Sequence, residues 1–102
     1  MFDRRFGQRR PIELFFNKYL AGQPYLCRSV DLSPGGVLAF TFSEPAHELE
    51  SFPLELRLPR AEQSLWVWAR GVWRSEGRQA IEFLGLAAED RTTLNGFLAA
   101  LA

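Results

Sequence analysis

Two short segments carry side chains whose types and spacing suit the binding of a phosphate or a nucleobase. The first reads Arg4-Arg5-Phe6-Gly7-Gln8-Arg9, an Arg-x-x-x-Arg spacing between Arg5 and Arg9 that Arg4 directly precedes. The second reads Asp31-Leu32-Ser33-Pro34-Gly35-Gly36, an Asp-x-Ser-x-x-Gly spacing. A guanidinium is a planar fork of donors that can bond phosphate or the O6/N7 edge of guanine and can stack on flat rings. The two segments therefore form the candidate binding site.

The charge balance limits what this site can bind. The chain has 12 Lys and Arg against 12 Asp and Glu, a net charge of zero. The charges are segregated, because residues 1–10 hold four arginines against one aspartate, whereas residues 44–62 hold five glutamates against two arginines. A neutral total argues against a nonspecific binder of nucleic acid, which needs a surplus of basic residues. A compact cluster of arginines is still compatible with one small dianion.

Length and composition indicate one globular domain of 102 residues, 47% of them hydrophobic and 14% aromatic. No apolar run approaches the roughly 20 residues of a membrane-spanning helix, and the first residues do not resemble a secretory signal. One cysteine allows neither an internal disulfide nor a multi-cysteine zinc site. We expect a cytoplasmic domain with no metal and no cofactor.

Residues for catalysis are scarce, so we expect no enzyme and no catalytic residue. His47 is the only histidine and lies in an acidic segment that we expect to be a solvated loop. Cys27 falls in a predicted strand, where it should act as a small buried hydrophobe. The glutamates of residues 44–62 lack the spacing of a calcium loop and are expected on a solvated face.

Hydrophobic periodicity predicts a mainly β fold that ends in one helix. Apolar residues alternate in several short runs, separated by turn-forming residues, and the last segment changes to the spacing of an amphipathic helix. We expect strands over residues 11–20, 25–31, 37–42, 53–58, 65–74 and 78–84, and a helix over 89–101. Six short strands and a helix suggest an antiparallel barrel that the helix plugs or flanks.

Two tryptophans of the fifth predicted strand share one face. Trp66 and Trp68 alternate with Val67, so both indoles point to the same side of the strand. That side is either an exposed aromatic patch for a partner or the surface beneath the C-terminal helix. We favour the surface beneath the helix.

The two motifs, in this order and around the first two predicted strands, resemble the signature of the PilZ family of bacterial cyclic di-GMP receptors. The likeness extends over nearly the whole chain, since Ala80-Ile81-Glu82-Phe83-Leu84 is similar to the family's closing strand, with Ala80 where many members have glycine. The resemblance implies a six-stranded antiparallel PilZ-type β-barrel with a C-terminal α-helix. It implies a single domain over 1–102, with a mobile Arg-rich head at 1–10, a barrel at 11–84 and a helix at 89–101.

The resemblance also assigns roles for binding cyclic di-GMP. Arg5 and Arg9 would bond phosphate or guanine, and Asp31 would accept from the N1 and N2 donors of guanine. Ser33 would donate its hydroxyl, and the backbone at Gly35 and Gly36 would approach the ligand closely or adopt a positive φ. A third guanidinium, Arg4, favours an intercalated dimer of the ligand. Additional candidates are Arg10, Trp73 and Arg74.

The expected mechanism is a switch in which the Arg-rich head folds across the barrel mouth when cyclic di-GMP binds, and signals to an effector protein or an adjoining domain. One alternative is a PilZ-like protein-interaction adaptor that binds no nucleotide. A second alternative is a small barrel that binds single-stranded nucleic acid through Trp66, Trp68 and Arg70. The neutral total charge disfavours the second alternative, so we expect no DNA partner.

Overall fold

The computed structural model describes residues 8–47 and 49–101 of the chain. Strands make up most of it, and one helix follows them. In chain order the elements are β1 (Arg10–Pro11), β2 (Phe15–Leu20), β3 (Gln23–Ser33), β4 (Gly36–Thr41), β5 (Ser51–Leu56), β6 (Leu65–Ser75), β7 (Arg78–Gly85) and α1 (Ala88–Ala100). Six longer strands and the helix are present as predicted, but the predicted strand 11–20 is wrong at its start, because Pro11 belongs to the two-residue β1 and β2 begins at Phe15.

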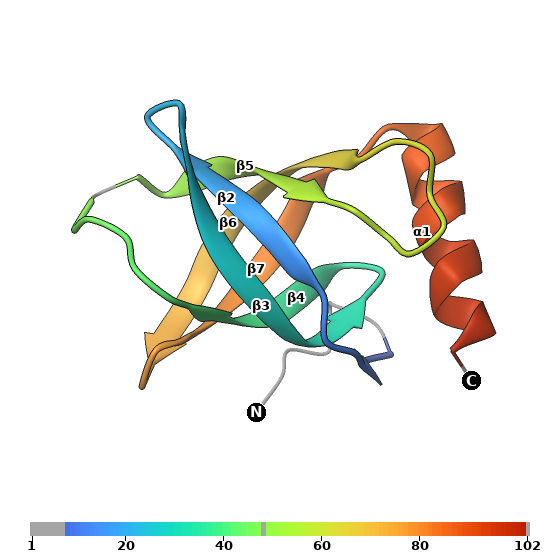
Figure 1. Ribbon diagram of the computed structural model, residues 1–102, viewed down its shortest axis with the longest axis horizontal. Coiled ribbons are helices and arrows are strands. Elements are labelled where there is room, and N and C mark those ends of the chain that lie inside the picture. The colour runs from blue at the N-terminus through green and yellow to red at the C-terminus, as the bar shows by residue number, and fades with distance from the viewer. Residues whose placement is uncertain (1–7, 48, 102) are drawn as a thin grey trace.

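The six longer strands close into an antiparallel barrel (Figure 1). The strand order is β2-β5-β6-β7-β4-β3, and the barrel closes because β3 pairs with both β4 and β2. The short β1 extends the pairing of β2 along the same edge of β3, with Pro11 opposite Asp31. The chain just before the barrel is thereby held against the end of β3.

Side chains alternate between the barrel interior and its outer surface, as in any half-buried strand. On β6, Trp66 and Trp68 lie outside and are 51% and 49% exposed. The residues that alternate with them belong to the buried interior cluster: Leu65, Val67 and Ala69. The alternation that predicted one face for the two tryptophans is therefore confirmed.

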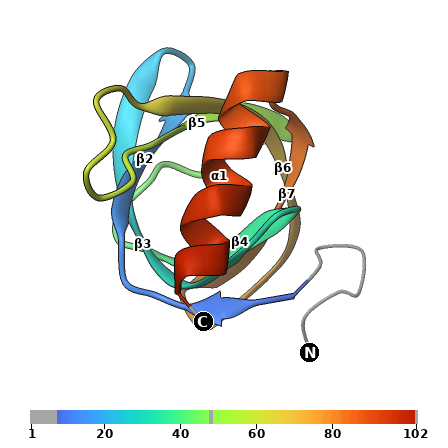
Figure 2. The same ribbon diagram turned by 90° about the vertical axis from the view of Figure 1, so that its right-hand side faces the viewer.

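The helix α1 lies across one end of the barrel (Figure 2). Its buried residues, Leu94 and Leu98, join the interior cluster of the strands. The expectation that Trp66 and Trp68 lie beneath the helix was wrong, because the helix covers the barrel end and leaves the outer face of β6 exposed. Within the described part of the chain, no helix is long and apolar enough to cross a membrane.

Two tight hairpins join neighbouring strands of the barrel. Ala21 and Gly22 connect β2 to β3 with φ of 51° and 81°, and Glu76 and Gly77 connect β6 to β7 with φ of 52° and 79°. Two successive residues with positive φ give the turn whose twist matches the twist of the flanking strands. The predicted short hairpin after β6 is confirmed.

Candidate functional site

The short β1 brings the end of the Arg-rich segment to Asp31, near the end of β3. Nη1 of Arg9 lies 3.8 Å from Oδ2 of Asp31, a distance for an ion pair and not for a hydrogen bond. The described parts of the two predicted motifs therefore meet at one place. Arg4 and Arg5, predicted for the same site, lie outside the described residues.

Asp31 is the least satisfied polar group at this place. Its side chain is 13% exposed, and its Oδ1 is buried with no hydrogen-bond partner among the described residues. Burial raises the pKa of this carboxyl, and the nearby Arg9 only partly opposes that rise. A buried acceptor without a donor costs free energy, so such a group is a reason to look for a ligand that supplies the donor.

The turn after Asp31 is closed by its own hydrogen bonds. The Ser33 hydroxyl is fully buried and donates to the carbonyl oxygen of Gly36 at 3.2 Å. The backbone N–H of Phe83 on β7 donates to the carbonyl oxygen of Gly35 at 2.8 Å. Ser33 and the two glycines thus hold the turn against β7. Among the described glycines, positive φ occurs at Gly22 and Gly77, so Gly35 and Gly36 do not adopt it, and their close approach to a ligand stays a prediction.

Asp31 stands at one end of a row of outward residues that crosses four strands. It pairs with Leu38 of β4, Leu38 pairs with Ala80 of β7, and Ala80 pairs with Trp73 of β6. Leu38 and Ala80 form a small apolar cluster of their own with Val30 and Val72. Trp73 is 37% exposed and lies on this outer surface rather than in the barrel core. We call Asp31, Leu38, Ala80 and Trp73 the outer strip.

Comparisons with known proteins identify the family and the fold of this chain. The sequence pattern described as the PilZ domain matches residues 3–100. The chain belongs to the PilZ domain family. A comparison with curated protein sequences found no match.

Three solved structures share the fold. The PilZ domain of CeSA from a cellulose-synthesizing bacterium has a TM-score of 0.70 at 20% identity, over 93% of this chain and 98% of that chain. The PilZ domain with c-di-GMP of YcgR from Escherichia coli has a TM-score of 0.72 at 21% identity, over 97% and 92% of the two chains. The Bacillus subtilis inhibitor of motility MotI/DgrA has a TM-score of 0.72 at 24% identity, and this chain spans 49% of it.

One flank of the outer strip of this PilZ domain holds two arginines that were not singled out in the sequence. The guanidinium carbons of Arg28 and Arg78 lie 4.8 and 5.3 Å from the ring centroid of Phe40. Both arginines pair with Phe40 in the sheet, Arg28 from β3 and Arg78 from β7. Arg28 and Phe40 also line a cavity of about 430 Å³ beside β1. The signal was present in the alternation, since Phe40 is two residues from Leu38 and Arg78 two residues from Ala80.

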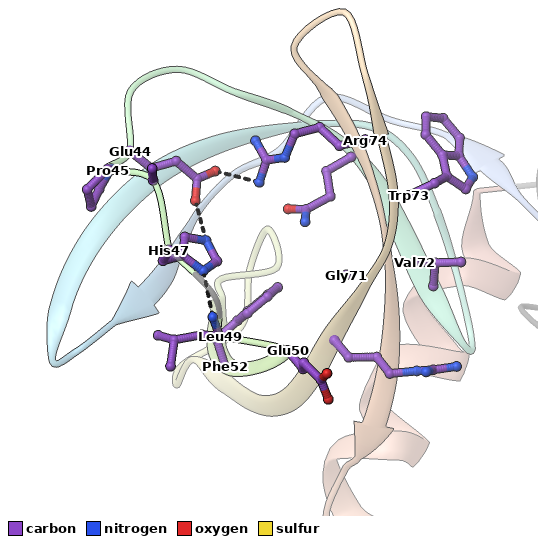
Figure 3. Close-up of a pocket in the computed structure, with 13 residues that line it drawn as sticks. Glu44, Pro45, His47, Leu49, Glu50, Phe52, Gly71, Val72, Trp73 and Arg74 are labelled. Carbon is purple, nitrogen blue, oxygen red and sulfur yellow. Dashed lines mark hydrogen bonds and ion pairs between the residues drawn. The ribbon is translucent and has the colours of Figure 1, made fainter.

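Two of the additional candidates lie away from Asp31 in the PilZ domain. Arg10 lines a cavity of about 300 Å³ with Pro34 and Asn95 beside the helix, and the contact with Asp31 is made by Arg9. Arg74 donates from Nη2 to Oε1 of Glu44 at 3.1 Å. Its partner lies in the loop between β4 and β5 (Figure 3).

Glu44 anchors this loop to the barrel and corrects two expectations. Its carboxylate, 8% exposed, also accepts from Nζ of the fully buried Lys18 at 2.8 Å and contacts Nε2 of His47 at 3.1 Å. Glu44 is therefore not on a solvated face, because the buried ammonium of Lys18 needs a carboxylate partner. His47 is not a solvated side chain either, because it lies against the same carboxylate and is 17% exposed. Lys18 also donates to Oε1 of Gln79 at 2.8 Å.

The anchored loop lies at the end of the barrel opposite the helix (Figure 1). Together with β6 it lines a cavity of about 790 Å³ (Figure 3). Trp73 and Arg74 line this cavity together with Glu44 and His47. Cys27 lies in the interior, fully buried as expected, and burial raises its pKa to about 11. The described residues contain no cluster of side chains that could hold a metal ion.

Proposed function

We propose that this PilZ domain is a receptor for cyclic di-GMP and that Asp31 reads a guanine of the ligand. The observation that carries the proposal is the buried Oδ1 of Asp31, which has no partner among the described residues although Arg9 lies beside the same carboxylate. A guanine offers two adjacent donors, N1–H and N2–H, to a carboxylate, whereas adenine does not offer them in that arrangement. The ligand would thus satisfy the acceptor that the protein leaves open.

The surroundings of Asp31 suit the rest of such a ligand. Arg9, whose side chain is 45% exposed, can turn its fork to a phosphate or to the O6/N7 edge of guanine. Trp73, which is 37% exposed at the far end of the outer strip, offers a ring on which a purine can stack, whereas Leu38 and Ala80 between it and Asp31 are buried. Support also comes from family membership and from the YcgR domain of the same fold, which was solved with c-di-GMP.

The proposal extends to the predicted head of residues 1–10. Binding would fix Arg4 and Arg5 over the ligand, so that contacts made only in the bound state supply the free energy of the switch. A domain of this size would then pass the signal to a partner protein or an adjoining domain. Arg4 would add a third guanidinium, which favours two ligand molecules per chain in an intercalated dimer.

Isothermal titration with cyclic di-GMP tests this function. Loss of one charged contact costs about 1.5–3 kcal/mol, so Arg9→Ala and Asp31→Asn should each weaken binding roughly 10- to 150-fold. Arg91→Ala, which removes an exposed arginine of α1, is the matched control and should bind like the parent. Cyclic di-AMP should bind much more weakly than cyclic di-GMP.

The same titration gives the stoichiometry. Two ligands per chain are expected for the parent and one for Arg4→Ala. A value of one for the parent contradicts the dimer part alone. Parent-like affinity in both Arg9→Ala and Asp31→Asn would show that the site is misassigned, and absence of binding at millimolar ligand would refute the receptor function.

A further inference from the structure

A second exposed surface of the barrel is aromatic and lies on β2 and β6. We define the aromatic patch as Tyr19, Trp66 and Trp68. The rings of Tyr19 and Trp66 are in contact, with centroids 5.3 Å apart and planes inclined by 44°. Trp66 and Trp68 are each about half exposed, and Pro53 of the intervening β5 is opposite Trp68. Exposed contiguous aromatic surface of this kind commonly marks an interaction site.

The charged groups that border the aromatic patch already have partners in the chain. Glu55 accepts from the Tyr19 hydroxyl at 3.1 Å with Oε1 and from the Ser64 hydroxyl at 2.9 Å with Oε2. Nε of Arg70 donates to Oε1 of Glu82 at 2.7 Å. The patch therefore favours a largely uncharged surface as its partner, because a charged one would have to displace these pairs.

The hydrogen-bonding groups of the aromatic patch are complementary to one another. Among the described residues, no acceptor bonds the indole N–H of Trp66 or Trp68. The Tyr19 hydroxyl donates to Glu55, so its oxygen can still accept. One patch thus offers both donors and an acceptor, and two copies facing each other across a two-fold axis could satisfy both.

We propose that the aromatic patch is the interface of a symmetric dimer of this chain. The same surface meets itself in such a dimer, so it must be self-complementary, as the paired border charges and the mixed donors and acceptor allow. The net charge of zero means that two copies do not repel each other strongly. Three aromatic residues cover less than the ~800 Å² per partner of a standard stable interface, so the dimer is weak, with a Kd on the order of 10–100 µM.

Sedimentation velocity of the ligand-free chain tests this dimer. The parent should shift from monomer to dimer between about 5 and 500 µM protein. Trp66→Ser and Trp68→Ser should each weaken self-association at least about tenfold, and the double variant should stay monomeric. Phe42→Ser is the matched control, because Phe42 is 56% exposed but outside the patch, and it should dimerise like the parent.

The outcomes separate this interface from the proposed ligand site. Circular dichroism verifies that each variant is folded, and the double variant should retain the parent's affinity for cyclic di-GMP per chain. A parent that is monomeric at every concentration overturns the dimer. A dimer that persists in the folded double variant, or that Phe42→Ser disrupts equally, overturns the assignment to this patch.

Discussion

Replacing Asp31 by asparagine should separate ligand binding from stability. In the free protein the carboxylate has one buried oxygen that no described residue hydrogen-bonds, and burial raises its pKa. Arg9 therefore offsets only part of the cost of keeping this charge buried. Asparagine has nearly the same shape and removes that charge, so Asp31→Asn should be tolerated by the fold while it removes the group that would accept from guanine.

The effect of Asp31→Asn on the free energy of unfolding is the sum of one loss and one gain. The lost attraction to Arg9 spans 3.8 Å to a side chain that is 45% exposed, and pairs of this kind contribute about 0–1 kcal/mol. The gain is relief from burying a charge, which is of similar size or larger. The free energy of unfolding should therefore change by less than about 1 kcal/mol, and Tm by less than about 8 °C. Affinity for cyclic di-GMP should fall roughly 10- to 150-fold.

The pH dependence gives an independent check on this reasoning. Because the pKa of Asp31 is raised in the folded state, protonated Asp31 favours folding. That contribution is fully present below the ordinary aspartate pKa of about 3.9 and is lost as pH rises through the raised value. The stability of the parent relative to Asp31→Asn should therefore increase as the pH is lowered from 7 toward 4 in thermal unfolding.

One result would refute the reasoning about Asp31. If Asp31→Asn lowers the stability of the free protein by more than about 2 kcal/mol at pH 7, the carboxylate is part of the structural framework. A loss of affinity in that variant would then reflect a damaged fold and not a lost contact.

Three further predictions concern the polar network inside the barrel. Glu44→Ala leaves the buried Lys18 without its carboxylate partner and should lower the free energy of unfolding, measured by chemical denaturation, by about 3 kcal/mol. Lys18→Met, which removes the buried charge itself, should lower it by less. The control Glu50→Ala removes an exposed carboxylate and should change it by less than about 0.5 kcal/mol. Burial alone would raise the pKa of Glu44, but its hydrogen bonds and charge interactions with Lys18 and Arg74 outweigh burial, so the pKa is lowered. The stabilisation from ionised Glu44 is therefore fully present above the ordinary glutamate pKa and is lost as pH falls through the lowered pKa of the folded state. The difference in unfolding free energy between the parent and Glu44→Ala should therefore become smaller in acid. A Cβ at Gly71 would lie 2.5 Å from Nε2 of Gln79, so Gly71→Ala should displace that amide from Lys18 and lower the unfolding free energy by about 1–2 kcal/mol.

The sequence allowed the barrel to be predicted because each long strand shows its own alternation. The two residues of β1 are too few to show any period, and the pairing of Pro11 with Asp31 depends on β3. Lys18 had a readable signal, since it shares the inward positions of β2 with Phe16 and Leu20. Its partner Glu44 had none, because it lies 26 residues away in a loop whose composition is that of a solvated segment. Pairing between distant segments is a tertiary property that local composition does not encode.

Two irregularities of the sheet explain why alternation could not place the site itself. On β3, Cys27 belongs to the interior cluster and Ser29 pairs with Ala39 of that cluster, so strict alternation would turn Asp31 inward as well. The register shifts between Ser29 and Asp31, and the extra residue, Val30, turns Asp31 to the outer surface.

A second β-bulge occurs on β6, where the register shifts between Gly71 and Trp73. Strict alternation from Val67 and Ala69 would direct Trp73 into the core, and the shift at Val72 turns it outward instead. The two ends of the outer strip are therefore residues that a bulge turns outward, Asp31 on β3 and Trp73 on β6. Leu38 and Ala80 lie between them. Two bulges on different strands thus direct a polar and an aromatic group to one face of the barrel. The proposed binding of a guanine at Asp31 would make use of this arrangement, because a flat ligand with a polar edge could contact both side chains.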